Sequence, residues 1–149
     1  MRTHQITASA TVAAPAARVY GIIADYRHGH PQILPRPPFG DIVVEQGGVG
    51  ARTIISFPMR LFGRTRIYRA VVSEPERGRV LVESYPNDDT ATTFTVEPLS
   101  EHACRVTIST ELKTRGGPLG MIERWLVGRF LRGVYERELR LLETAANAP

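Results

Sequence analysis

Cysteine is almost absent from this sequence of 149 residues, in which Cys104 stands alone. A single cysteine excludes an internal disulfide, and a chain of this length buries enough surface to fold without one. No apolar run approaches the ~20 residues that span a bilayer, which excludes a transmembrane helix and stable membrane insertion. Because residues 1–5 lead into small and polar residues rather than a secretory apolar core, we expect a cytoplasmic protein.

Lysine is equally scarce: Lys113 is alone among 19 basic residues, and the formal net charge is +4. The arginines are scattered along the chain, and no basic run is flanked by aromatic residues. A nucleic-acid groove needs clustered charge that neutralises several phosphates together, so the sequence argues against nucleic-acid binding. The mild basicity suits an acidic partner or the anionic head group of a ligand.

Motifs for cofactor or metal chemistry are also missing. The sequence holds no Walker loop, dinucleotide fingerprint, nucleophile elbow or Cys–His pair, so no catalytic residue is assigned and no cofactor is expected. His28 and His30 offer two nitrogens, but a metal site needs more ligands, and only His4 and His102 remain. We expect no metal site and interpret His28 and His30 as exposed loop residues, with a general acid or base as the alternative.

The beginning of the chain predicts one strand and two short helices. Apolar and polar residues alternate over 5–12, which is typical of a half-buried strand. Pro15 suits a first helical position, and the spacing that follows predicts a helix over 15–24. Gly21 lies inside this helix at a cost of ~1 kcal/mol relative to alanine, so we expect it to pack closely against a neighbour. Prolines limit any further helix to one turn at 30–34.

From residue 39 onward, regularly spaced turn residues predict a meander of antiparallel strands. The strands are expected at 39–46, 51–58, 64–74, 79–85, 90–97 and 103–112. A helix from Pro118 to about Ala146 follows, roughly 40 Å long at about 1.5 Å per residue, so it must cross the whole domain. Its apolar stripe is expected to comprise Leu119, Ile122, Leu126, Phe130, Val134 and Leu141. We expect residues 1–149 to form one domain.

Three stretches carry a family resemblance: residues 6–15 running into 18–25, the strand end at 68–75, and the terminal helix that contains Trp125. Together with the order of elements, they resemble the helix-grip fold of the START/Bet v 1 (SRPBCC) superfamily, especially its polyketide cyclase/dehydrase and lipid transport branch. The resemblance implies an α+β fold in which a curved seven-stranded antiparallel sheet surrounds a long C-terminal helix, with two short helices after the first strand. It also implies an apolar ligand inside the grip and, in some members, cyclisation or dehydration of a bound polyketide.

Strand parity selects the side chains that can face such a cavity. Phe57 and Met59 share one face of their strand, and Phe94 lies on the corresponding face of another. The opposite parity points charged residues inward, so we expect these three side chains to form an apolar ligand wall. The alternative is that they pack against Trp125 and Phe130 and leave no cavity.

The strand at 64–74 and its neighbour leave one question open. Either parity sends a polar group inward, since Arg69 lies on one strand and Glu83 and Tyr85 lie on the next. If both side chains point inward, Arg69 and Glu83 neutralise each other as a buried ion pair, or the arginine binds an anionic ligand. The alternative is a solvated ion pair on the convex face, worth well under ~1 kcal/mol.

The terminal helix and one hairpin complete the candidates. Trp125 is expected to face the ligand, while Arg129 either contacts a ligand head group or extends to water. Arg137 ranks lower, because the helix end is expected to leave the cavity. Leu61 and Phe62 form an unusually apolar turn, which either gates the cavity or contacts a partner, since two residues are too few for membrane anchoring.

Three functions are compatible with these features. The first is non-catalytic binding or transport of a lipid, polyketide or isoprenoid-like molecule. The second is a polyketide aromatase/cyclase or dehydratase whose substrate is held by an acidic acyl carrier protein, with enolate charge stabilised by a tyrosine, histidine or arginine side chain; Arg69 and Tyr85 are the residues to substitute in a test. The third is a co-chaperone or regulatory interaction domain, indicated only by the turn at 61–62. The expected ligand-binding residues are Phe57, Met59, Arg69, Glu83, Tyr85, Phe94, Trp125 and Arg129.

Overall fold

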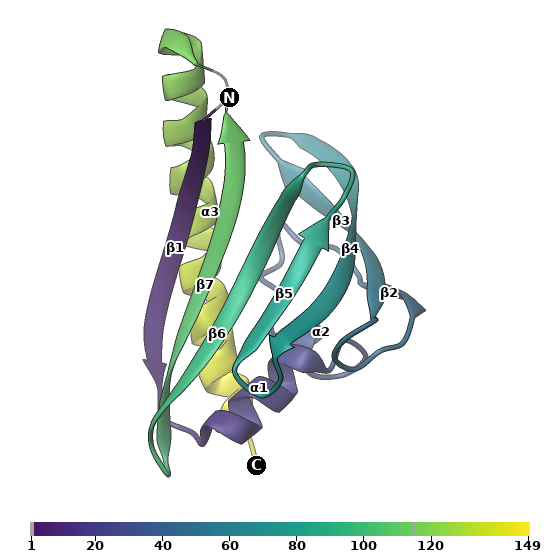
Figure 1. Ribbon diagram of the computed structural model, residues 1–149, viewed down its shortest axis with the longest axis vertical. Coiled ribbons are helices and arrows are strands. Elements are labelled where there is room, and N and C mark those ends of the chain that lie inside the picture. The colour runs from purple at the N-terminus through teal and green to yellow at the C-terminus, as the bar shows by residue number, and fades with distance from the viewer. Residues whose placement is uncertain (1, 115) are drawn as a thin grey trace.

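The computed structural model describes residues 2–114 and 116–149, which form a seven-stranded antiparallel sheet packed against a long helix (Figure 1). The strands are β1 (Arg2–Val12), β2 (Val43–Gln46), β3 (Ile54–Leu61), β4 (Arg64–Glu76), β5 (Val80–Tyr85), β6 (Thr90–Ser100) and β7 (Ala103–Thr114). The helices are α1 (Ala16–Ala24), α2 (His30–Ile33) and α3 (Gly117–Ala146). This is the α+β helix-grip architecture that the sequence predicts, with its elements in the predicted order.

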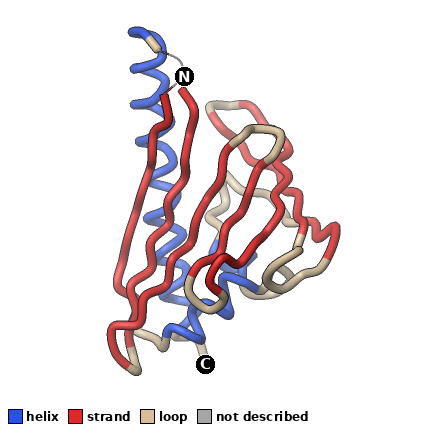
Figure 2. The backbone as a smooth tube through the Cα atoms, viewed as in Figure 1, coloured by secondary structure: helices blue, strands red, loops and turns tan. Residues whose placement is uncertain are grey.

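The strand order is β1-β7-β6-β5-β4-β3-β2. Strands β2 to β7 each pair with their neighbours in sequence, and only β1 pairs with a distant strand, β7. The chain between β1 and β2 carries α1 and α2, which lie at the end of the sheet where α3 finishes (Figure 2). One end of the interior is therefore covered by helices.

The register of the strands determines which side chains face the interior. One row of directly paired residues crosses the sheet from β1 to β4, and all its members are buried. This row comprises Ile6, Thr110, Thr92, Glu83 and Val72. The inner face of the sheet is therefore polar at its centre and apolar towards both sides.

Helix α1 is held against the sheet by Tyr20, whose hydroxyl donates to the Glu74 carboxylate at 2.6 Å. The backbone N–H of Ala51 donates to the other oxygen of Glu74 at 2.7 Å. Gly21 lies on the outer side of α1, where an added Cβ would meet no atom within 4 Å. The prediction that Gly21 packs closely against a neighbour is therefore wrong.

Strand β2 begins later than predicted, at Val43 instead of residue 39. The backbone N–H of Phe39 donates to the carbonyl of Pro35 at 3.1 Å, which closes a turn. Phe39 pairs with Met59 only through an isolated bridge. The prolines before Phe39 thus delay the start of the strand, and the segment before β2 crosses over the interior instead.

Helix α3 runs along β1 and β7, and its first turns project beyond the end of the sheet (Figure 1). Its C-terminal end is anchored, because Glu143 accepts a hydrogen bond from the backbone N–H of Ala13 at 3.0 Å. The predicted apolar stripe is wrong over its first half: Leu119, Ile122 and Leu126 are exposed, because this face of the helix is turned away from the cavity that Val127 and Leu131 line. The buried residues of α3 are Gly120, Gly128, Leu131, Val134, Tyr135, Glu138, Leu139, Leu142 and Ala146.

Candidate functional site

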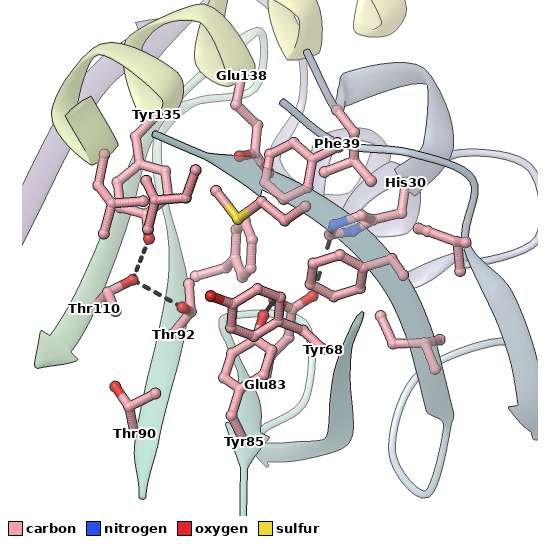
Figure 3. A pocket seen from close by; sticks show the side chains of 18 of the residues that line it. His30, Phe39, Tyr68, Glu83, Tyr85, Thr90, Thr92, Thr110, Tyr135 and Glu138 are labelled. Atoms are coloured by element: carbon pink, nitrogen blue, oxygen red, sulfur yellow. Dashed lines mark hydrogen bonds and ion pairs between the residues drawn. The ribbon is translucent and has the colours of Figure 1, made fainter. Parts of the chain in front are cut away.

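A cavity of about 140 Å³ lies between the inner face of the sheet, the segment 30–42 and α3 (Figure 3). Most of its lining side chains are aliphatic or aromatic. An apolar cavity of about 150 Å³ holds benzene, whereas sites for drug-sized ligands occupy roughly 300–1,000 Å³. The enclosed space therefore corresponds to about one ring.

Phe57, Met59 and Phe94 line this cavity, as strand parity predicts. All three are buried, and the register places Phe57 opposite Tyr68. The ring of Phe57 also meets the ring of Tyr85 edge-on, with 6.3 Å between their centroids. These side chains surround an open space, so the alternative of solid packing against Trp125 is wrong.

Glu83 lies on the sheet side of the cavity and is only 5% exposed. The hydroxyl of Tyr26 donates to Oε2 of Glu83 at 2.6 Å, and the hydroxyl of Tyr85 donates to Oε1 at 2.8 Å. Burial, and then the charge of Glu83, raises the pKa of Tyr26 and Tyr85 well above the ordinary value. Both phenols therefore remain protonated and hold the two oxygens of this carboxylate.

His30 is buried against the same cluster. Its Nδ1 lies 2.7 Å from the carbonyl oxygen of Ile23, which only accepts, so Nδ1 donates. The Nε2 atom lies 3.6 Å from Oε2 of Glu83, and the ring stacks on Tyr26 with 4.4 Å between centroids. The interpretation of His30 as an exposed residue is wrong, whereas His28 is exposed as expected.

Glu138 projects into the cavity from α3, on the side opposite the sheet (Figure 3). It is 3% exposed, and its carboxyl has no hydrogen-bond partner within residues 2–114 and 116–149. Burial, and then the charge of Glu83, raises the pKa of Glu138 well above its ordinary value. This shift favours the protonated carboxyl, which can donate a hydrogen bond to an oxygen of a ligand.

Hydroxyl groups form a further polar side of the cavity. The hydroxyls of Thr92 and Thr110 share a hydrogen bond at 2.8 Å, and Thr110 also bonds to the hydroxyl of Tyr135 (Figure 3). The Oγ1 atom of Thr90 is buried without a partner in the described part of the chain. Glu138 and Thr90 thus each offer the cavity a hydrogen-bonding group that no described residue engages.

The structure separates Arg69 from Glu83, so both predicted arrangements of this pair are wrong. In the β4–β5 register Glu83 lies opposite Val72, which places Ala70 and Val72 on the inner face. Arg69 therefore points outward, where its Nε donates to Glu45 at 3.1 Å. Glu83 is inside and is satisfied by tyrosines instead of an arginine.

Trp125 and Arg129 also lie outside the cavity. Trp125 is 60% exposed, and the guanidinium of Arg129 lies over its ring at 5.5 Å from the centroid. The prediction that Trp125 faces the ligand is wrong, because this part of α3 turns Val127 and Leu131 inward instead. Arg137 donates to the carbonyl of Pro37 at 3.3 Å, which ties α3 to the proline-rich segment.

The hairpin between β3 and β4 lies beside α3. Leu61 lines the cavity, while Phe62 is 59% exposed and packs on Phe130 with 5.7 Å between ring centroids. Leu61, Leu112 and Val127 are lining residues that are only half-buried. Phe39, Ile42, Tyr68 and Thr90 also line the cavity and are half-buried, so the cavity is not closed off from the surface.

The family model for polyketide cyclase / dehydrase and lipid transport matches residues 3–147. The chain belongs to this family. No curated protein matches the sequence. The family assignment confirms the resemblance that the sequence carries.

Solved structures similar to this family member share its fold at low sequence identity. The KanY protein has a TM-score of 0.86 at 23% identity, and the match covers 99% of this chain and 100% of KanY. A START superfamily protein from Mycobacterium smegmatis has a TM-score of 0.74 at 16% identity, covering 96% and 97%. Zhui aromatase/cyclase from Streptomyces sp. R1128 has a TM-score of 0.66 at 19% identity, covering 97% and 92%.

Sequence reasoning missed several cavity residues of this family member, above all Glu138 and Tyr135. A signal was present, because Leu131, Tyr135, Glu138 and Leu142 recur at the spacing of one helix face. Glu138 interrupts this row, and the row through Leu119 is the more apolar of the two. Tyr26 lies after α1 in the irregular segment, where periodicity says nothing about direction.

Proposed function

We propose that this protein binds an apolar small molecule of about one ring, and that the molecule carries an oxygen that accepts a hydrogen bond from Glu138. The observation that supports this proposal is the Glu138 carboxyl, which is buried, faces an apolar cavity and lacks a partner among the described residues. A ligand oxygen that accepts from this carboxyl adds a hydrogen bond worth about 1 kcal/mol net. Thr90 offers a second hydrogen-bonding group.

The size of the cavity supports the small end of the range of predicted ligands. Burying a ring of about 150–250 Å² contributes roughly 4–6 kcal/mol before the cost of immobilisation. We therefore expect dissociation constants in the micromolar to millimolar range for a single ring. A long acyl chain or a fused polyketide has to leave part of its length outside this cavity.

A matched pair of ligands tests the proposal: acetophenone, whose carbonyl accepts a hydrogen bond, and ethylbenzene, which lacks it. We expect calorimetry to show saturable binding of both, with acetophenone favoured about fivefold, the worth of one net hydrogen bond of about 1 kcal/mol. In Glu138→Leu the preference disappears, whereas in Glu136→Leu, an exposed position on the same helix, it stays. Equal affinities in the unaltered protein contradict a role for Glu138.

A polyketide aromatase/cyclase or dehydratase is the second candidate function. It is supported by two carboxyl groups at one cavity, with Glu138 favoured in the protonated form and Glu83 held by two phenols. Such a pair suits general acid–base chemistry on a carbonyl compound. The name of the similar Zhui aromatase/cyclase is compatible with this reaction class. Only this second function requires an acidic acyl carrier protein as a partner.

Turnover separates the two candidates. A poly-β-ketone thioester on an acyl carrier protein is incubated with the protein, and the cyclised products are quantified. If the protein is an enzyme, we expect it to form cyclised product, and we expect Glu138→Gln and Tyr85→Phe to abolish this activity. Arg69→Ala serves as the control, because Arg69 lies outside the cavity. A product profile equal to that of the protein-free reaction leaves ligand binding as the function.

A further inference from the structure

The first turns of α3 expose an apolar surface on the side away from the cavity. We call this surface the α3 tip; it comprises Leu119, Met121, Ile122, Trp125 and Leu126, all of them exposed. Leu119 is 82% exposed, and the tip spans roughly 10 Å at about 1.5 Å per residue. Figure 1 shows the first turns of α3 projecting past the end of the sheet.

Positive charge adjoins the α3 tip. Arg124, Arg129 and Arg132, together with His4 and Trp125, line a surface groove between α3 and β1. Within residues 2–114 and 116–149, no carboxylate lies within ion-pair distance of these arginines, whereas four other cationic side chains have such a partner. These three arginines, the arginine collar, lie along one side of the α3 tip; the nearby carboxylates of the same helix, Glu123 and Glu136, form no ion pair with them among the described residues.

We propose that the α3 tip and the arginine collar dock this protein peripherally on an anionic lipid bilayer. Apolar side chains next to arginines on one helix are typical of segments that lie in a membrane interface, where tryptophan is also favoured. Each arginine near an anionic surface strengthens binding about fivefold, equivalent to about 1 kcal/mol. Docking differs from insertion, because no described helix combines the length and apolarity needed to cross a bilayer.

Charge argues against a second copy of the chain as the occupant of this surface. A two-fold contact through the α3 tip sets two arginine collars side by side, and like charges at such a contact are repulsive. An anionic lipid surface instead offers phosphates to the arginines and an apolar layer to Leu119 and Ile122. An anionic bilayer therefore interacts favourably with both the α3 tip and the arginine collar.

The β3–β4 hairpin, which contributes Leu61 to the cavity, also contacts α3 close to the tip. Val127 and Leu131, which follow the α3 tip in the sequence, line the cavity from the opposite face of the helix. Phe62, at the tip of the β3–β4 hairpin, packs on Phe130 and is itself exposed. Docking through the α3 tip therefore places the exposed Phe62, next to the cavity residue Leu61, on the same side of the molecule as the bilayer.

Trp125 makes the test direct, because it is the only tryptophan of the chain. The protein is titrated with vesicles of phosphatidylcholine alone and with vesicles that also contain phosphatidylglycerol. We expect a blue shift of Trp125 emission and co-sedimentation only with the anionic vesicles, with both effects decreasing as salt is added. Millimolar inorganic phosphate is expected to leave the emission unchanged, because a free anion does not cover the α3 tip.

Charge-matched variants identify the surface. Arg129→Glu with Arg132→Glu is expected to lower the partition coefficient at least about 25-fold, from about fivefold per arginine. The control is Arg79→Glu with Arg140→Glu, which changes the net charge equally at exposed positions away from the α3 tip. Leu119→Ser with Ile122→Ser is also expected to abolish binding, whereas Ile67→Ser with Leu99→Ser, at other exposed apolar positions, is not.

Three results overturn the proposal. The first is equal binding to both vesicle types, and the second is an equal loss in the control variants. The third is a lipid-free dimer, detected by light scattering, that Leu119→Ser with Ile122→Ser dissociates, because it assigns the surface to a second copy. All these exposed variants are expected to keep acetophenone binding, so a failure here is distinct from a failure of the proposed ligand site.

Discussion

Glu83 and Glu138 face the same cavity in different surroundings. Glu83 accepts hydrogen bonds from Tyr26 and Tyr85, whereas the Glu138 carboxyl has no such partner in the described part of the chain. Two phenol donors compensate the buried charge of Glu83, and its charge in turn disfavours a second negative group nearby. The pair thus consists of a satisfied carboxylate and a carboxyl that is available to a ligand.

The raised pKa of Glu138 predicts a pH dependence of stability. The folded protein keeps a proton that the unfolded chain releases above the ordinary pKa of 4.5, so stability falls as the pH rises from there through the raised pKa. The decrease is at most about 1.4 kcal/mol per pH unit. Glu138→Gln removes this titration, so urea unfolding is expected to show equal stability near pH 4 and a growing advantage for the variant above it.

Glu136→Gln is the control for this measurement, because Glu136 is exposed on the same helix. Its stability is expected to follow that of the unaltered protein at every pH. A Glu138→Gln curve parallel to that of the unaltered protein contradicts the raised pKa.

Removal of one phenol donor tests the role of the tyrosines. Tyr26→Phe leaves the buried carboxylate of Glu83 with one donor, and hydrogen bonds to charged groups are worth about 1.5–3 kcal/mol. We expect the free energy of unfolding to decrease by about that amount. Tyr68→Phe is the control, since Tyr68 packs on Phe57 and Tyr85 without a hydrogen bond to Glu83. A loss no larger than that of the control contradicts the assigned role.

At the scale of elements, α3 shows where periodicity misleads. Helical spacing found an apolar row through Leu119 and Leu126, but periodicity does not reveal where the sheet beneath the helix ends. The buried row includes Glu138. Its carboxyl can be buried because it faces the cavity and because its raised pKa favours the neutral, protonated form. Strand parity alone could not decide whether Arg69 and Glu83 face inward or outward. That direction depends on how β4 pairs with β5, and this register, which shifts between Ser73 and Glu76, is not visible in the sequence of either strand.

Helix α1 offers a prediction about stability. Gly21 lies inside the helix with open space around its Cα, so Gly21→Ala is expected to raise the free energy of unfolding by roughly 0.5–1 kcal/mol. Gly50→Ala is expected to do the opposite. Gly50 has a φ of 68°, and an added Cβ would lie 2.3 Å from the Glu74 carboxylate. Thermal unfolding of both variants checks the pair, and a destabilising Gly21→Ala contradicts the open surroundings of Gly21.

At the scale of the whole molecule, the order of elements was readable from alternation, turn residues and the long helical segment. The apolar wall of Phe57, Met59 and Phe94 was also readable, because each lies on a strand whose other face carries charge. The polar side of the cavity was not, since Tyr26 and His30 come from an irregular segment and Glu138 from a helix. Only tertiary packing brings these three groups to Glu83.

The central claim is that ligand occupies the cavity between the sheet and α3. Backbone and side-chain NMR shifts recorded during titration with acetophenone test it most directly. The account predicts saturable shifts at Phe94, Leu131, Tyr135 and Glu138, with the indole of Trp125 unchanged because it lies outside. Shifts confined to the surroundings of Trp125, or shifts that never saturate, would contradict it.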